Sequence, residues 1–343
     1  MDRSGTVLLT GASGFLAKHV ALRLLNAGCR VRGTVRSMDR GREVRAAVLP
    51  KLRDPSAEGR LSFVEADLEA DEGWDRAMRG VTALVHTASP FVAAQPADPA
   101  VLLRPAVEGT RRVLGAALRA GVWRVVLTSS LAAVIHRPPP PAGAEFTEED
   151  WSDPDYPTAT AYARSKTLAE RAAWEMAAAS DGALALTTIL PGFAIGPPLD
   201  DRYGTSVALV RRFLRGRDRL IPRYGLPLVD VRDAAEMHLR ALDRPETAGQ
   251  RYAAVAGSLW LQEIAAALKA AHPDCRIASR LAPDLAVRLL GLFDREVRAI
   301  VPALGRIDHV SNAKARHEME MGFTAPRESL RSTAAYLMAR GLD

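Results

Sequence analysis

The chain has very few cysteines and no long apolar segment. Among its 343 residues only Cys29 and Cys275 are cysteines, which is too few for a disulfide framework. No stretch approaches the ~20 apolar residues that a membrane span needs, and the N-terminus lacks the basic segment and hydrophobic core of a secretion signal. These absences exclude disulfide-stapled and membrane-spanning classes. We therefore expect a cytoplasmic protein with no membrane partner.

Lysine is also scarce, although the chain is basic. The net charge is +6 and the pI is about 9.6, and the arginines are interspersed with acids rather than gathered in a stripe with aromatic residues. We therefore expect no nucleic-acid partner, and no Cys/His cluster has the spacing of a metal site. A lysine that is kept inside a chemical motif of such an arginine-rich chain is informative. The five lysines are Lys18, Lys51, Lys166, Lys269 and Lys314.

Short apolar runs alternate with helical patterns in the first half of the chain. The runs cover residues 7–10, 31–35, 61–64, 83–87, 125–129 and 186–190, and the helical patterns cover 15–27, 42–49, 75–79, 101–120 and 161–179. Strands that alternate with helices form crossover units and a parallel sheet. Runs that are apolar on both faces indicate strands covered by helices on each side. The pattern predicts an α/β fold with a doubly wound parallel sheet.

The rhythm changes after about Pro191, where prolines and glycines interrupt irregular segments. Helical patterns return at 206–214, 232–241, 261–271, 284–290 and 329–338. We see no internal repeat. The prediction is a sheet domain over residues 1–195 and, mainly over 196–343, a smaller and mostly helical substrate lobe, with segments around 225–255 returning to the sheet domain.

The first turn of the chain reads strand, Gly-x-x-Gly-x-x-Ala, helix. Gly11 permits a tight turn, Gly14 lets the backbone approach a pyrophosphate, and Ala17 lets the helix pack closely on the sheet. The free N–H groups and the positive dipole end of the following helix would then face the phosphates. In its alternating context this motif predicts a Rossmann domain that binds a dinucleotide.

The end of the second strand distinguishes the two nicotinamide dinucleotides. NAD-binding domains usually place an acid there to bind the ribose 2′-OH, but this chain has Arg36 and Ser37, followed by Arg40 and Arg42. Arginine suits a 2′-phosphate because it forms charge-assisted, bidentate hydrogen bonds. We therefore expect NADP(H) as the cofactor, with Asp67, after the third strand, placed to meet the adenine amino group.

Three further residues complete a chemical constellation. Ser129 and Ser130 end the fifth strand, and Tyr162 and Lys166 stand four positions apart within a helical pattern. That spacing places the tyrosine and the lysine on one helix face. A serine pair at a strand end, a Tyr-x-x-x-Lys helix and a dinucleotide turn together indicate carbonyl or alcohol redox chemistry.

The chain resembles an extended short-chain dehydrogenase/reductase over nearly its whole length. The branch is that of dihydroflavonol reductases, cinnamoyl-CoA reductases and microbial aldehyde or ketone reductases. The segments that carry the resemblance are TGASGFLA, VRGTVRS, the Asp67–Leu68 pair, VHTASPF, PAVEGT, VVLTSS, YARSKTLAERAAWE, PGFAIGPP and VDVRDAAEMHLRAL.

The resemblance implies a role for each matching residue. Tyr162 would be the general acid, Lys166 would lower the pKa of Tyr162 and hold the nicotinamide ribose, and Ser130 would bind the substrate oxygen. We expect Ser129 and His86 to pack rather than to catalyse. The remaining residues expected to bind the cofactor are Gly11, Ser13, Gly14, Phe15, Leu16, Arg36, Ser37, Asp67, Leu68, Thr87, Ala88, Ser89, Thr128, Pro191, Gly192 and Phe193.

At several positions the sequence differs from related families, and these differences restrict the class of substrate that we expect. Flavonoid reductases typically carry an asparagine where this chain has Ile135, and the segment EEDWSDPDYP lacks the signature of cinnamoyl-CoA reductases. The helix after the fourth strand also lacks the asparagine that serves a proton relay in related families. We therefore expect an apolar or aromatic ketone or aldehyde, not a plant-type flavonoid or a CoA thioester. The candidate pocket residues are Phe91, Val92, Ile135, Tyr203 and Thr205; Tyr156, Tyr224 and His136 are expected mainly to pack.

Other functions remain open at this point. A nucleotide-sugar epimerase or dehydratase would retain NAD and usually carry an acid in place of Arg36, and dehydratases place Asp-Glu where this chain has Leu131 and Ala132. A 3β-hydroxysteroid dehydrogenase would run the chemistry in the oxidative direction. A non-enzymatic NADP(H) sensor could use the same fold. The chain could be a monomer or a homodimer.

Overall fold

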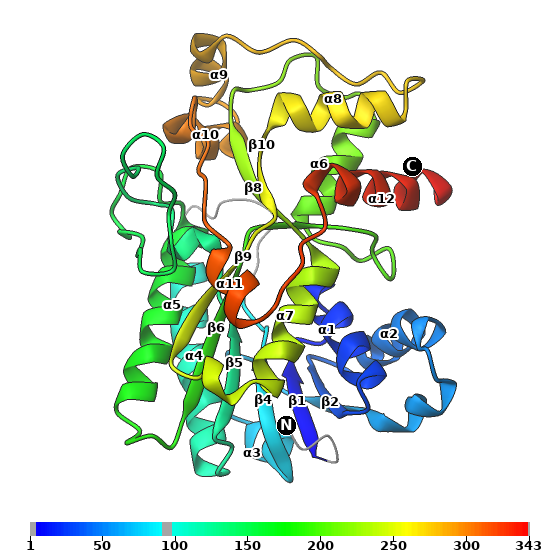
Figure 1. Ribbon diagram of the computed structural model, residues 1–343, viewed down its shortest axis with the longest axis vertical. Coiled ribbons are helices and arrows are strands. Elements are labelled where there is room, and N and C mark those ends of the chain that lie inside the picture. Colours follow the sequence, from blue (N-terminus) through cyan, green and yellow to red (C-terminus); the bar gives the residue numbers. More distant parts are fainter. Residues whose placement is uncertain (1–4, 91–97, 342–343) are drawn as a thin grey trace.

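The computed structural model describes residues 5–90 and 98–341. Its main feature is a seven-stranded parallel sheet in the order β3-β2-β1-β4-β5-β6-β9 (Figure 1). The order reverses between β1 and β4, and doubly wound sheets bind their ligands at the carboxyl ends of the strands at such a point. The strands are β1 (Thr6–Thr10), β2 (Arg30–Val35), β3 (Leu61–Glu65), β4 (Val81–His86), β5 (Arg124–Thr128), β6 (Ala185–Pro191) and β9 (Gln250–Ala254).

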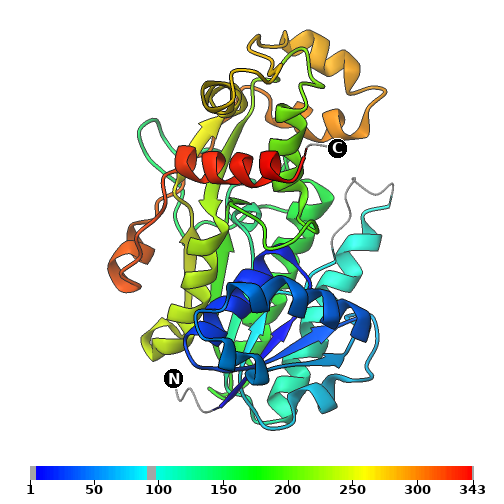
Figure 2. The same ribbon diagram turned by 90° about the vertical axis from the view of Figure 1, so that its right-hand side faces the viewer.

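Helices cover both faces of this sheet (Figure 2). Along β1, Val7 and Leu9 point to one apolar core and Leu8 to the other, because successive side chains of a strand alternate between its faces. The first face carries α1 (Phe15–Asn26), α2 (Met38–Val48) and α7 (Val231–Asp243), and the second carries α3 (Trp74–Met78), α4 (Ala100–Arg119) and α5 (Ala161–Ala178). The predicted α/β class with a doubly wound parallel sheet is confirmed.

The C-terminal part forms a smaller lobe that is mostly helical, as expected, but it also contains a three-stranded sheet in the order β10-β8-β7. The sequence analysis missed this sheet because its strands are short and β8 contains Pro227, so no alternating or continuous apolar run marks them. The elements are β7 (Phe193–Ile195), β8 (Gly225–Asp230), β10 (Gly257–Trp260), α6 (Thr205–Leu214), α8 (Leu261–Ala271), α9 (Asp284–Leu290), α10 (Arg295–Ile300), α11 (Ala313–Glu318) and α12 (Pro326–Ala339).

The chain returns to the large sheet after β8. Helix α7 packs against α1, and β9 pairs with β6, where Tyr252 lies opposite Ile189. The exact domain boundary at residue 195 stays a prediction. Within the described ranges, no helix is both long and apolar enough to cross a membrane.

Candidate active site

The glycine turn between β1 and α1 packs closely against the loop after β4 and leaves the start of α1 uncapped. Gly11 has φ +64°, and a Cβ there would lie 2.9 Å from the Ala88 Cα. Gly14 caps α1 in an extended conformation, with no side chain capping the helix and no acid in its first turn. The N–H groups of that turn and the positive end of the helix dipole are therefore left for an anion.

Three arginines follow the carboxyl end of β2, and they differ in whether an acid pairs with them. Arg36 is exposed and has no hydrogen bond or ion pair with any described residue. Arg40 lies 3.0 Å from Glu43, whereas Arg42 pairs with Asp39 and both of these side chains are largely exposed. Arg36 is therefore the residue of this strand end whose guanidinium is open to a ligand.

The loop after β4 lies next to the glycine turn. Thr87 and Ala88 are held by Thr10, because the amide of Ala88 donates to Thr10 Oγ1 at 3.0 Å and the Thr87 hydroxyl donates to the Thr10 carbonyl. His86 shares a hydrogen bond of 2.7 Å with the same Oγ1. Burial lowers the pKa of His86 to about 3, so this imidazole is neutral and serves to hold β1 and β4 together. Asp67 accepts from the amide of Glu69.

Ser130, Tyr162 and Lys166 come together at the carboxyl end of β5. Thr160 caps α5 by accepting from the Ala163 amide, which starts the helix just before Tyr162. The Tyr162 side chain is hydrogen-bonded to Ser130. One turn further along α5, Lys166 donates to the Thr128 carbonyl at 3.1 Å. The strand end and one helix face thus present two hydroxyls and one ammonium group to the same site.

The electrostatics of Tyr162 differ from the expectation. Burial raises the pKa of Tyr162, and the hydrogen bond from Ser130 opposes that rise only in part. Burial lowers the pKa of Lys166 to about 8, and the nearby charge of Glu170 opposes this fall. The phenol is therefore held in its protonated, donating form, and the lowering of its pKa by Lys166 stays a prediction for the cofactor-bound site.

Glu170 is a residue that the sequence analysis missed. Its side chain is fully buried one turn beyond Lys166 and forms an ion pair of 2.8 Å with Arg251 of β9. The Ser129 hydroxyl donates to the same carboxylate at 2.5 Å and the Thr188 hydroxyl at 2.9 Å. Glu170 thus joins α5 to β6, to β9 and to Ser129 after β5, on the same helix face as Lys166. The signal in the sequence was its spacing, four positions after Lys166.

Replacing Glu170 by alanine should lower the free energy of unfolding by about 3–5 kcal/mol, because it leaves the Arg251 charge buried without its partner. Urea denaturation monitored by circular dichroism would measure this loss. Glu175, on the same helix but largely exposed and 3.6 Å from Arg111, offers a matched control. Glu175→Ala should change stability by no more than about 0.5 kcal/mol, and a similar small change for Glu170→Ala would contradict the structural role of the pair.

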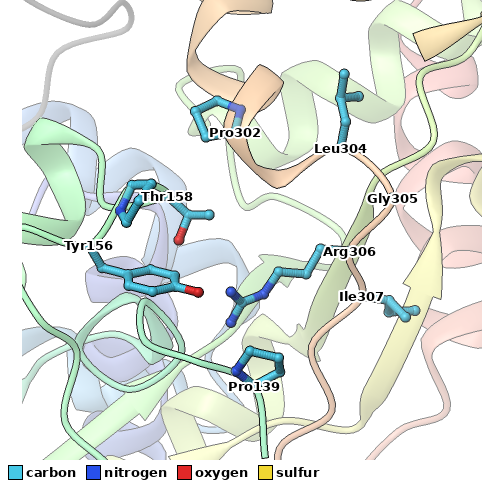
Figure 3. A pocket seen from close by; sticks show the side chains of 9 residues that line it. Pro139, Tyr156, Thr158, Pro302, Leu304, Gly305, Arg306 and Ile307 are labelled. Atoms are coloured by element: carbon cyan, nitrogen blue, oxygen red, sulfur yellow. The ribbon is translucent and has the colours of Figure 1, made fainter.

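Two cavities lie near these residues. A small one of about 10 Å³ is lined by Lys166, Thr128, Ser129, Ser89 and Glu170 among others. A larger, open one of about 540 Å³ lies between the segment before α5 and the chain after α10 (Figure 3). The residues lining this larger cavity are Pro139, Tyr156, Pro157, Thr158, Pro302, Leu304, Gly305, Arg306 and Ile307.

The larger cavity adjoins the segment that follows Ser130, although Ser130, Tyr162 and Lys166 do not line it. Arg306 donates to the Ile135 carbonyl at 2.6 Å and lies 5.8 Å from the Tyr156 ring. His136 shares a hydrogen bond of 2.9 Å with Thr158, and burial lowers the pKa of this histidine to about 4.

Among the described residues, those predicted to form the substrate pocket lie in different parts of the structure and do not form one pocket. Tyr156 faces the larger cavity, whereas Tyr203 and Tyr224 pack against the core of the smaller lobe. Ile135 packs beside a small apolar core that includes Leu131. Thr205 begins α6. Phe91 and Val92 lie outside the described residues.

The geometry and the sequence together place the chain in a family. A model of the NAD dependent epimerase/dehydratase family matches residues 7–256. The chain belongs to this family, which is the extended short-chain dehydrogenase/reductase type expected from its motifs.

The structure shows no metal site within residues 5–90 and 98–341. In these ranges, no group of three or more His, Cys, Asp or Glu side chains is arranged to hold a metal ion.

Individual relatives are reductases by name. The chain is 36% identical to ketoreductase azaE of Aspergillus niger over 81% of its own length and 85% of that protein. It is 35% identical to tetraketide alpha-pyrone reductase 1 of Arabidopsis thaliana, over 82% and 85% of the two chains. The fold is similar to that of yeast methylglyoxal/isovaleraldehyde reductase Gre2 complexed with NADPH, with a TM-score of 0.80, 27% identity and coverage of 98% and 100%.

Proposed function

We propose that this protein is an NADP(H)-dependent reductase of ketones or aldehydes, able to run in reverse as an alcohol dehydrogenase. The observation that carries the proposal is the convergence of the Ser130 hydroxyl, the Tyr162 phenol and the Lys166 ammonium at the carboxyl end of β5. This convergence lies at the same edge of the sheet as the glycine turn. One protonated phenol beside a second hydroxyl suits protonation of a carbonyl oxygen.

The residues present fit the cofactor. The start of α1 suits a pyrophosphate, since it has no side-chain cap and no acid in its first turn, so its N–H groups are left for an anion. The exposed, unpartnered Arg36 suits a 2′-phosphate, and no acid occupies its place. Bound NADPH would supply the hydride. The relative Gre2, solved with NADPH, supports the same assignment.

The chain's own residues would carry the proton and the charge. Ser130 and Tyr162 would donate hydrogen bonds to the substrate carbonyl oxygen, which polarises the carbonyl. As that oxygen gains negative charge, Tyr162 would transfer its phenolic proton to it and become a phenolate. The positive charge of Lys166 would stabilise the phenolate, because an opposite charge nearby favours the ionised form.

The substrate we propose is an apolar or aromatic ketone or aldehyde. The larger cavity next to the Ile135 segment offers about 540 Å³ and is lined by one tyrosine, three prolines, a leucine and an isoleucine as well as by Arg306, so it suits an apolar group beside one positive charge. The names of the relatives, which include a ketoreductase and a methylglyoxal/isovaleraldehyde reductase, agree with carbonyl substrates. The test is an NADPH-oxidation screen over aromatic aldehydes, diketones, keto esters and steroid ketones. No turnover of any of them, with tightly retained NAD in the purified protein, would favour an epimerase or dehydratase instead.

Arg36→Asp should reverse the cofactor preference. The new carboxylate would repel a 2′-phosphate and accept a hydrogen bond from the 2′-OH of NADH. A charge-assisted hydrogen bond contributes about 1.5–3 kcal/mol, so loss of the arginine alone should weaken NADPH by roughly tenfold to a hundredfold. Since Arg40 can still contact the phosphate, we expect the lower end of this range. The measurement is kcat/KM for both cofactors with one substrate.

The control for Arg36→Asp makes the same substitution at an arginine that lies away from the expected phosphate position. Arg53 is exposed and lies beyond α2, so Arg53→Asp should leave the ratio of the two kcat/KM values within about twofold when ionic strength is matched. A wild type that already prefers NADH, or an Arg36→Asp variant with an unchanged ratio, would overturn the NADP(H) assignment.

A further inference from the structure

A loop of the smaller lobe is anchored on the helix that follows the glycine turn. We call residues 196–204, between β7 and α6, the clasp loop. Lys18 of α1 forms an ion pair with Asp200 of this loop and donates to the Arg202 carbonyl at 3.0 Å. The Lys18 side chain is only 3% exposed, and a buried ammonium is costly without its partners. One of the five lysines of the chain thus fixes the backbone at residue 202 against the cofactor-binding helix.

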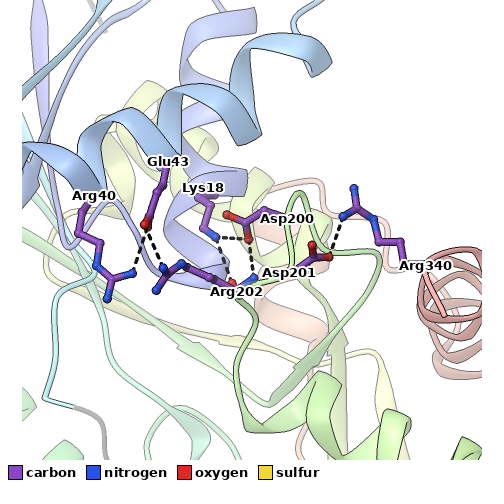
Figure 4. A network of polar contacts seen from close by, with 7 residues as sticks. All are labelled: Lys18, Arg40, Glu43, Asp200, Asp201, Arg202 and Arg340. Atoms are coloured by element: carbon purple, nitrogen blue, oxygen red, sulfur yellow. Dashed lines mark hydrogen bonds and ion pairs between the residues drawn. The ribbon is translucent and has the colours of Figure 1, made fainter. Parts of the chain in front are cut away.

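The same loop delivers an arginine to the start of α2. Arg202 Nη2 lies 2.9 Å from Glu43 Oε1, and Arg40 Nη1 lies 3.0 Å from the other oxygen of that carboxylate. Figure 4 shows the two guanidinium groups on either side of Glu43, next to the Lys18 anchor. One carboxylate therefore gathers two arginines from distant parts of the chain at one end of α2.

The charges at this end of α2 do not balance. The cations there are Arg36, Arg40, Arg42 and Arg202, and the acids are Asp39, Glu43 and Glu65, whose carboxylate accepts from the Met38 amide, so one positive charge is in excess. The excess is positive at the strand end where the 2′-phosphate is expected. The Arg202 side chain is 56% exposed, against 36% for Arg40, so its guanidinium is open to a ligand from solvent while Glu43 holds it beside Arg40.

We propose that Arg202 is a cofactor-specificity residue, a cation that the clasp loop presents to the 2′-phosphate of NADP(H). The inference rests on the proposed function, because it assumes NADP(H) at the glycine turn. Glu43 holds Arg202 and Arg40 beside the phosphate position, and the Lys18–Asp200 pair keeps the loop there. The smaller lobe thereby takes part in choosing the cofactor, a choice otherwise left to the β2–α2 segment.

The proposed role of Arg202 can be tested by measuring the binding of two small nucleotides, which requires no catalytic activity. Adenosine 2′,5′-bisphosphate and adenosine 5′-monophosphate differ only in the 2′-phosphate, and isothermal titration calorimetry on the whole chain would give both Kd values. Arg202→Ala should weaken the bisphosphate by about tenfold, the lower end of what a charge-assisted bond contributes. The monophosphate should change by less than about twofold.

Arg340 provides the matched control. It pairs with Asp201 of the same loop at 2.7 Å, and its side chain is similarly exposed, but it directly follows α12 and, among the described residues, forms no hydrogen bond or ion pair with α2. Arg340→Ala should leave both Kd values within about twofold. Because surface charges act at a distance when salt is low, the titrations are run at two ionic strengths.

The outcomes separate the two proposals. A selective loss of bisphosphate affinity in Arg202→Ala supports the inference. If the wild type prefers the bisphosphate but Arg202→Ala binds it equally well, or if Arg340→Ala weakens it as much, Arg202 is not a specificity residue and the proposed function stands. If the wild type binds both nucleotides equally, the NADP(H) assignment fails and the inference fails with it.

Discussion

Tyr162→Phe is expected to reduce kcat for carbonyl reduction by about 10²–10⁴-fold, the contribution typical of general acid catalysis. The substitution removes only the hydroxyl that is hydrogen-bonded to Ser130, and the ring keeps its packing. The affinity for NADPH should therefore stay within about twofold of wild type. Steady-state kinetics with the best carbonyl substrate, together with a fluorescence titration of NADPH, would measure both quantities.

A second tyrosine in the same region serves as the control. Tyr156 lies before α5 and lines the larger cavity rather than the site at Ser130. Tyr156→Phe should leave kcat within a few-fold of wild type. Retention of more than about a tenth of wild-type kcat by Tyr162→Phe would remove Tyr162 from the role of general acid.

Lys166→Met should damage cofactor binding and chemistry together, and kcat/KM should fall on the order of 10³-fold, since both a charged hydrogen bond and part of the acid catalysis are lost. The pH profile gives the more specific result. Burial lowers the pKa of Lys166 to about 8, so its positive charge is present below that pH and is lost above it. Wild-type kcat/KM should therefore decline above about pH 8.

In Lys166→Met this decline should disappear, and the optimum of the residual activity should move to higher pH. The charge that favours the Tyr162 phenolate is then gone, so the phenol keeps its proton over a wider range. Lys51→Met, at an exposed position, should keep both the wild-type activity and the wild-type profile. An unchanged profile with full activity in Lys166→Met would contradict the assigned role.

The sequence by itself determined six of the seven strands of the large sheet and the positions of most helices, but it did not mark β9 as a strand. Each of the first six strands was found within two residues of its predicted ends, because a strand covered on both sides must be apolar throughout and its neighbours in the chain show where it stops. The small sheet was not predictable, since β7 has only three residues and β8 contains a proline. Such strands are stabilised by their partners across the sheet rather than by their own pattern.

For the candidate site the sequence determined what is local, and the tertiary structure decided what is distant. The glycine turn and the Tyr162–Lys166 pair lie within one or two helical turns, so their spacing alone defines their geometry. The ion pairs of Glu170 with Arg251 and of Lys18 with Asp200 join residues 81 and 182 positions apart. Their charges meet only because the folded sheet brings β9 beside β6 and lays the clasp loop on α1. A pattern in the chain records which side chains share a face of one element, but the packing of different elements decides which of those faces meet.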